Sequence, residues 1–413
     1  MRRAENRSPQ RAPKQRVTEF SLAWISSALS TVGTRTLGVV YPLLALALHH
    51  SPTEAGWTGF ALTVPILVFY IPAGVLVDRL EPRSIMMATE LLRGLVVASL
   101  AVAMLFGIVT LPWLIAAALL EGTLWVFYSL AETALLPSLV KPGRLHRALA
   151  QNETTVHFAA LTGRPLGGYL VGCGHLVLFL VNAVLFFGSW GTLLGIKRPL
   201  ARKAETPLFH QLSDGLRILL NQPFLRSAIA LVTVTNLMVN ATIMIFIAGS
   251  SGLSSATVGL VLAAGGVGGV IGSSVAVYRP PPRSMLIIHM WVWVAALLLA
   301  AVGSNLGERP VFFGMALFVT GFVGALSNVV IRTAEVRHIA SEMLARVVSV
   351  SRLSAHGAVC LAAPLGGLLV DGYGVNGASS VLFVIMFGIA ALSTLPVLFR
   401  REHVPALLMH TGD

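Results

Sequence analysis

The sequence has little charge and little cysteine for its length. Only 11% of its 413 residues are Asp, Glu, Lys or Arg, whereas 55% are hydrophobic. Soluble domains contain about 25% charged residues, so a soluble domain of this length could not bury so much apolar surface. The two cysteines, Cys173 and Cys360, fall on different apolar segments. We therefore expect no disulfide and interpret both thiols as small packing residues.

Several motifs that would indicate other functions are also missing. No G-x-x-x-x-G-K-[ST] segment occurs, so the chain has no phosphate-binding loop for ATP. The glycine-rich run at 265–272 lies inside an apolar segment, where its spacing favours close helix packing rather than dinucleotide binding. No nucleophile and base cluster with catalytic spacing, which disfavours an enzyme. No basic patch is interleaved with exposed aromatic residues, which disfavours a nucleic-acid partner.

The chain does contain twelve apolar stretches of about 20 residues, each long enough to cross a hydrocarbon core of about 30 Å. We predict an all-α membrane protein with twelve transmembrane helices, because lipid satisfies no backbone hydrogen bonds and the short alternation of a membrane barrel is absent. The predicted spans are 20–47, 55–77, 84–106, 111–136, 148–172, 175–196, 223–248, 256–277, 284–303, 311–332, 346–370 and 377–399.

The net charge of +12 is distributed unevenly between the connections. Lys and Arg cluster in alternate connections, whereas the intervening ones carry almost none. This asymmetry predicts a multi-pass protein of the cell membrane with both termini in the cytoplasm. The basic clusters lie at 2–16, 79–83, 141–147, 197–203, 279–283, 332–346 and 400–401.

One segment of the sequence occurs twice. Residues 145–172 match residues 344–371 at a constant offset of 199, and Pro-Leu-Gly-Gly at 165–168 falls on the same four residues at 364–367. Such parallel repeats in an apolar chain are typical of one class of transporters. We predict a disordered basic cytoplasmic tail (1–18), a six-helix half (19–196), a cytoplasmic linker with a short amphipathic helix around 212–220 (197–222), a second six-helix half (223–399) and a cytoplasmic tail (400–413).

The connection after the second span reads GVLVDRLEPRSIMMATELLRG, from Gly74 to Gly94. It resembles the basic motif of the major facilitator superfamily, and specifically of its drug:proton antiporter-3 branch, which includes macrolide and enterobactin exporters. Two residues depart from the branch pattern, Pro82 in place of a base and Arg164 in place of a small residue. The resemblance implies a monomeric transporter that works by alternating access, binds a small molecule within the lipid bilayer and needs no cofactor beyond a proton gradient.

The resemblance also implies a gate at this connection. In the branch, an acid and its basic neighbours stabilise the outward-open state through their charges and a helix dipole. Alternatively, the bases only set the topology and Glu90 with Arg93 forms a self-contained i,i+3 pair. The gate residues implied here are Asp78, Arg79, Arg83, Glu90 and Arg93.

Polar residues recur at helical spacing inside four apolar segments. Glu121, Trp125, Tyr128 and Glu132 form one stripe, and Glu153, His157 and Arg164 form another. Ionisable groups in a membrane are costly unless paired or hydrated, so we expect a shared aqueous cavity. Candidate substrate-wall residues are Trp125, Tyr128, Asn236, Asn240 and Asn328.

Arg35 and Glu121 both lie midway along their segments, so we predict that they face each other. This pair allows three interpretations: Glu121 binds the coupling proton when the pair separates, the pair is purely structural, or Arg35 binds an anionic substrate. His157 either titrates near neutral pH or, like its repeat His356, only packs.

Together these features predict a proton-coupled exporter of amphipathic small molecules, either drug-like compounds or siderophore-like metabolites. Three alternatives stay open: an uptake permease or symporter for a small metabolite, a polytopic membrane enzyme, and a transport-inactive scaffold or sensor.

Overall fold

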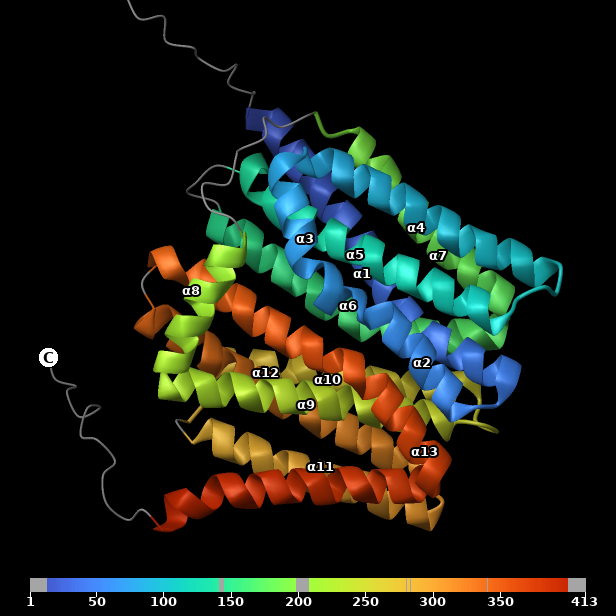
Figure 1. Cartoon of the computed structure of the whole chain (residues 1–413), viewed down its shortest axis with the longest axis vertical. Helices are drawn as coiled ribbons and strands as arrows, with labels where there is room; N and C mark the ends of the chain where they lie inside the picture. Colours follow the sequence, from blue (N-terminus) through green and yellow to red (C-terminus); the bar gives the residue numbers. More distant parts are fainter. Residues whose placement is uncertain are drawn as a thin grey trace, which may run out of the picture.

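The computed structural model describes residues 13–140, 145–197, 208–279, 281–282, 284–339 and 341–399. All elements formed by these residues are helices (Figure 1). They are α1 (Pro13–His49), α2 (Pro52–Thr63), α3 (Pro65–Arg79), α4 (Pro82–Leu105), α5 (Leu111–Leu139), α6 (Leu145–Cys173), α7 (His175–Leu194), α8 (Leu208–Asn221), α9 (Pro223–Ala248), α10 (Ser255–Tyr278), α11 (Met285–Leu306), α12 (Arg309–His338) and α13 (Ser341–Phe399).

The helices form two groups that lie one above the other in Figure 1, α1–α7 and α9–α13. Each group has its own apolar core, and the short helix α8 lies at one end of both. This helix corresponds to the amphipathic helix predicted in the linker. Helix α1 begins at Pro13, so it includes part of the segment predicted to be a disordered tail.

The predicted spans match the helices once two breaks are taken into account. Ten helical segments of the described chain are long and apolar enough to cross a membrane. The second span is divided at Val64 because Pro65 cannot donate a backbone hydrogen bond. The last segment, Leu353–Thr394, contains two spans, since the chain turns back at Gly374, where φ is 67°. Because this segment counts twice, the ten segments give eleven crossings. Helix α6, which packs between α1 and α10, is the twelfth.

The two ends of the bundle differ in charge. The basic face carries α8 and the connections after α3 and α10, with Arg79 and Arg279. The opposite face carries the connections 50–51, 106–110 and 249–254, which contain no Lys or Arg. In Figure 1 the basic face lies to the left, where α8 is seen, and α2 approaches α13 towards the opposite face at the right.

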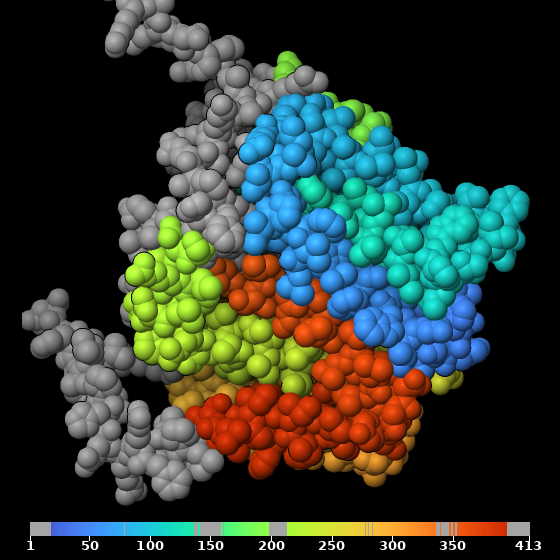
Figure 2. Space-filling model, viewed as in Figure 1, coloured from blue at the N-terminus to red at the C-terminus, as the bar shows by residue number. Residues whose placement is uncertain are grey.

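The two groups touch along two seams near the opposite face. Helix α6 packs on α10, and the first part of α13 packs on α2, a boundary that Figure 2 shows where blue meets orange. Each Pro-Leu-Gly-Gly copy lies in one seam. Gly167 and Gly366 pack on helices of their own group, α1 and α9, whereas Gly168 and Gly367 contact α10 and α2 of the other group.

The repeated segments therefore do not form their main contacts with each other. Helix α6 packs on α10 and α13 packs on α2 instead. These two partners, α10 and α2, hold equivalent positions in the two groups. Close backbone approach at glycine allows this packing.

Candidate functional site

A buried ion cluster lies inside the first helix group. Arg93 on α4 contacts Glu121 on α5 through Nε at 2.7 Å and through Nη2 at 2.6 Å. Its Nη1 contacts Glu90, one turn earlier on α4, at 2.8 Å. The side chains of Arg93 and Glu90 are 0% exposed and that of Glu121 is 2% exposed. The i,i+3 pair of Glu90 and Arg93 is thus present, but it is not self-contained, because Arg93 also binds Glu121.

Helix α1 supplies hydroxyl groups to the same cluster. Arg93 donates to Ser30 Oγ at 2.7 Å and to Thr34 Oγ1 at 2.6 Å, and Ser30 donates to Glu90 at 2.9 Å. The guanidinium also lies over the ring of Phe186 on α7, 4.1 Å from its centroid, a favourable cation–π geometry. Residues of four helices in the first group, α1, α4, α5 and α7, therefore contact Arg93.

The charges within this cluster do not balance. Two carboxylates face one guanidinium, so the fully ionised cluster carries one net negative charge. Glu90 and Glu121 each retain one buried oxygen, Oε2, that accepts no hydrogen bond from the described residues, and the buried hydroxyl of Tyr41 likewise has no partner there. A net charge in an apolar interior is costly. Binding of one proton to either carboxylate would remove it.

A line of hydroxyls extends from this cluster along α1 towards the basic face. Ser27 donates to Glu132, and Ser26 contacts the hydroxyl of Tyr128 at 3.2 Å and Ser189 on α7 at 2.8 Å. Glu132 is half-buried. These serines were not among the predicted site residues, although hydroxyl residues recurring every three or four positions in the first apolar segment would have indicated them.

The predicted pair of Arg35 and Glu121 is wrong. Glu121 is held by Arg93, and Arg35 forms no hydrogen bond or ion pair with any residue that the structure describes. Thr34 points into the ion cluster, and the next residue on a helix lies about 100° further round the axis. Arg35 is therefore directed towards α6, where its Cβ atom lies beside Gly163.

Arg164 follows Gly163 on α6 and is half-buried, as is Arg35. The two basic residues are neighbours where α1 meets α6, since Arg35 packs on Gly163, the residue before Arg164. Nη2 of Arg164 donates to Oδ1 of Asn240 on α9, in the other helix group, at 3.3 Å. Arg164 and Asn240 thus form a polar bridge between the groups.

The predicted gate residues separate into two locations. Glu90 and Arg93 belong to the buried cluster, not to the basic connection. Arg83 donates to the backbone carbonyls of Leu193 and Leu194 at the end of α7, at 3.0 and 3.3 Å, where a cation complements the helix dipole. Arg79 is exposed, and the side chain of Asp78 lies outside the described residues.

The stripe predicted on α5 is present but does not face one cavity. Tyr128 is buried against α1, and Glu121 is enclosed by the ion cluster. Trp125 faces the other group, with its ring 6.3 Å from that of His356 on α13. Around Glu121 the structure has a packed interior, closed by α1, α4 and α7, in place of the aqueous cavity that we expected there.

The remaining candidates differ in their surroundings. Asn236 is half-buried, and its carbonyl accepts a bond from Asn240 Nδ2 at 2.8 Å, whereas Asn328 is exposed. The side chains of Glu153 and His157 lie outside the described residues. Among the residues that the structure describes, no group of three His, Cys, Asp or Glu side chains could hold a metal ion.

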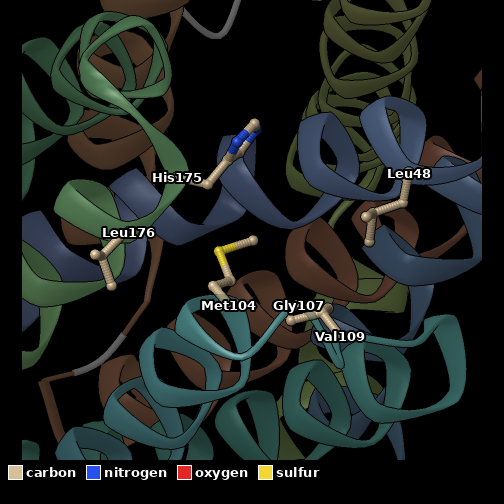
Figure 3. A pocket seen from close by; sticks show the side chains of 6 residues that line it. All are labelled: Leu48, Met104, Gly107, Val109, His175 and Leu176. Carbon is tan, nitrogen blue, oxygen red and sulfur yellow. The ribbon is translucent and has the colours of Figure 1, made fainter.

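An open depression of about 340 Å³ lies apart from these groups, at the opposite face of the first helix group (Figure 3). Its lining is mostly apolar. Met104, one of its residues, lies three turns beyond Arg93 on α4, about 16 Å along the axis. The depression therefore does not reach the ion cluster. It is lined by Leu48, Met104, Gly107, Val109, His175 and Leu176.

Comparisons with known proteins agree with this architecture. Over 418 residues the chain is 27% identical to the enterobactin exporter EntS of Escherichia coli, covering 95% of this chain and 96% of that protein. It is 26% identical to the multidrug efflux pump Tap of Mycolicibacterium fortuitum over 375 residues, covering 86% and 90%. A bacterial homologue of the human lysosomal transporter Spinster has the same fold, with a TM-score of 0.67, 14% identity and coverage of 95% and 100%.

The sequence profile of the Major Facilitator Superfamily matches residues 23–279. This match covers more than half of the chain and includes the basic connection, the ion cluster and Arg164. The resemblance predicted from the sequence is thus confirmed. The protein is a multi-pass membrane transporter, not an enzyme, and it belongs to the Major Facilitator Superfamily.

Proposed function

We propose that this transporter is a proton-coupled exporter of amphipathic small molecules, with its basic face in the cytoplasm. The observation that carries the proposal is the buried cluster in which Glu90 and Glu121 share the single cation of Arg93. Two carboxylates and one guanidinium in an apolar interior form a site with room for one proton. Ionisable groups at membrane depth typically mark ion or proton pathways in transporters.

The direction of transport is supported by the relatives. Two of them are exporters by name, one of enterobactin and one of several drugs. The line of hydroxyls on α1 that leads to the half-buried Glu132 gives the proton a polar route between the cluster and the basic face. Export would then use protons that enter from outside and leave into the cytoplasm.

Reconstituted proteoliposomes provide the test. A panel of amphipathic compounds is first screened for efflux in a sensitised host, and one transported compound is then followed under an imposed pH gradient. We expect Glu90→Gln and Glu121→Gln to abolish the dependence of transport on the gradient. Infrared difference spectra should also show a carboxyl proton signal in the wild type that each variant alters.

Glu335→Gln is the matched control, since Glu335 is another buried carboxylate paired with an arginine at i,i+3, Arg332 at 2.9 Å, in the other group. Its gradient dependence should equal that of the wild type. Unchanged gradient dependence in both cluster variants would contradict the proton site. Accumulation of substrate on the side of the basic face would instead favour an uptake symporter.

A further inference from the structure

Two arginines in the middle of the bundle have no acidic partner among the residues that the structure describes. Arg35 and Arg164 are both half-buried, and they are neighbours where α1 meets α6 at Gly163. In the part of the chain that the structure describes, neither forms an ion pair with a carboxylate. An unpaired cation inside a membrane protein is unfavourable, and two adjacent cations are more so. Such a pair needs an anion that this chain's described residues do not supply.

The backbone holds the two arginines together. Helices α1 and α6 meet at Gly163, where a Cβ atom would stand 2.6 Å from that of Arg35. Thr36 Oγ1 also donates to the carbonyl oxygen of Gly163 at 3.1 Å. Arg35 and Arg164 therefore stay neighbours as long as α1 and α6 stay packed.

Two acids of the first helix group, Glu121 and Glu153, are not placed to pair with them. Glu121 is bound by Arg93 at 2.6 Å and is enclosed by the ion cluster. Glu153 precedes Arg164 by eleven residues on the same helix, which places its backbone about 16 Å away along the axis. We therefore look for a counter-ion of the two arginines outside the described residues.

Asn240 orients Arg164 without neutralising it. The amide Nδ2 of Asn240 donates to the carbonyl of Asn236 at 2.8 Å, which directs Oδ1 towards Arg164. A guanidinium has five N–H donors, and only one of those of Arg164 is bonded to a described residue. The other donors remain available for a ligand, in the planar arrangement that suits a carboxylate or similar oxyanion.

We propose that Arg35 and Arg164 bind the anionic group of the substrate, so that the transported compounds are amphipathic anions such as carboxylates or sulfonates. This inference rests on the proposed function, since it names the substrate class of that transporter. The site lies beside the seam, because Pro165, the next residue after Arg164, contacts Gly259 of α10 through its carbonyl oxygen. Asn240 contributes from the second group, so the anion would sit where the two groups meet.

Equilibrium binding to the purified full-length protein in phosphatidylcholine nanodiscs, without a pH gradient, tests the proposal. The ligands are radiolabelled 1-naphthoate, 1-naphthalenesulfonate and the neutral 1-naphthamide. We expect at least one of the two anions to bind about tenfold more tightly than the amide, as charge-assisted hydrogen bonds imply. Arg35→Gln and Arg164→Gln should remove this preference.

Three controls separate the possible causes. Arg226→Gln, which replaces an exposed arginine on α9, should keep the preference. Arg35→Lys and Arg164→Lys keep the positive charge and should retain part of the preference for the anions. Partial retention would show that the Gln variants lose the preference through the missing charge and not through misfolding. Glu121→Gln should bind the anions normally, so a failure of proton coupling is distinguishable from a failure of anion binding.

Equal binding of amide and both anions by the wild type would overturn the proposal. So would a preference that survives both Gln substitutions. Loss of anion binding when phosphatidylglycerol is added to the nanodiscs would also overturn it, because the arginines would then hold a lipid headgroup.

Discussion

Gly168 of α6 lies so close to Gly259 of α10 that a Cβ atom added to Gly168 would stand 2.9 Å from the Cα atom of Gly259. The obstructing atoms are backbone, so they cannot rotate away as a side chain would. This contact joins the two helix groups near the opposite face. The closed seam therefore depends on the absence of a side chain at both positions.

Gly168→Val should shift the transporter towards the state in which the opposite face is open, because the larger side chain fits only when α6 and α10 separate. Thr53 on α2 and Asp371 on α13, joined by a 2.8 Å hydrogen bond, report closure at the other seam. With both native cysteines replaced, disulfide formation between Thr53→Cys and Asp371→Cys should fall several-fold in Gly168→Val.

Gly191→Val on α7 is the control for that measurement, since a Cβ atom there meets nothing within 4 Å. It should leave the crosslinking yield unchanged. Equal yields in Gly168→Val and wild type would show that the seam tolerates a side chain and that its glycines only pack.

Gly268→Val should destabilise the protein without changing which face is open. A Cβ atom at Gly268 would overlap the carbonyl oxygen of Phe318 on α12, within the same helix group. Overpacking of this kind costs about 1–3 kcal/mol, so thermal unfolding in detergent should begin at a lower temperature. Gly324→Val on α12 is the control, because a Cβ atom there meets nothing within 4 Å, and it should unfold close to the wild-type temperature. If both variants lost the same stability, the cause would be the valine side chain in general and not overpacking at Gly268.

Arg93→Met should be the most destabilising single change in the ion cluster. It removes the only cation from two buried carboxylates, and breaking a buried ion pair costs about 3–5 kcal/mol. Combining it with Glu90→Gln and Glu121→Gln should recover part of the lost stability, since no unpaired charge then remains. Thermal unfolding of the three proteins, wild type, Arg93→Met and the triple variant, measures this, and a triple variant no more stable than Arg93→Met would contradict the charge argument.

Cys173 and Cys360 allow the orientation to be measured. Cys173 is exposed at the end of α6 on the opposite face, whereas Cys360 is buried and its thiol donates to Thr63 at 3.0 Å. A membrane-impermeant maleimide added to intact cells should label Cys173 and not Cys360. Cys173→Ala should abolish the labelling. Labelling of Cys173 only in inverted vesicles would reverse the proposed orientation.

The sequence was sufficient to predict the twelve spans and the family, because these depend on segment length, apolar content and a repeat that is visible in one dimension. The pairing of Glu121 could not be predicted in the same way. Depth along a span follows from residue counting, whereas the direction in which Arg35 points depends on how α1 is rotated against its neighbours. That rotation is set by packing at sites such as Gly163 and Ser30.

The glycine-rich run at 265–272 shows a similar limit. Its spacing predicts close helix contacts but does not identify the partner helix. In the structure Gly268 and Gly272 pack on α12 within their own group, whereas Gly266 packs on Leu161 across the seam. Neighbouring glycines thus have different roles: some allow close packing within one group, and others allow contact between the groups. The sequence does not distinguish these roles, because it does not show which helix lies beside each glycine.

The paired glycines of each Pro-Leu-Gly-Gly copy have a mechanical consequence. In both copies the first glycine fixes the helix to its own group and the second touches the other group. We expect both helices to stay with their own group when a seam opens, because the first glycine packs each helix on its own neighbours. The groups would then move as rigid bodies, and we expect the two equivalent seams to separate together. On this view the opposite face opens in one step, without a stable intermediate in which only one seam has separated.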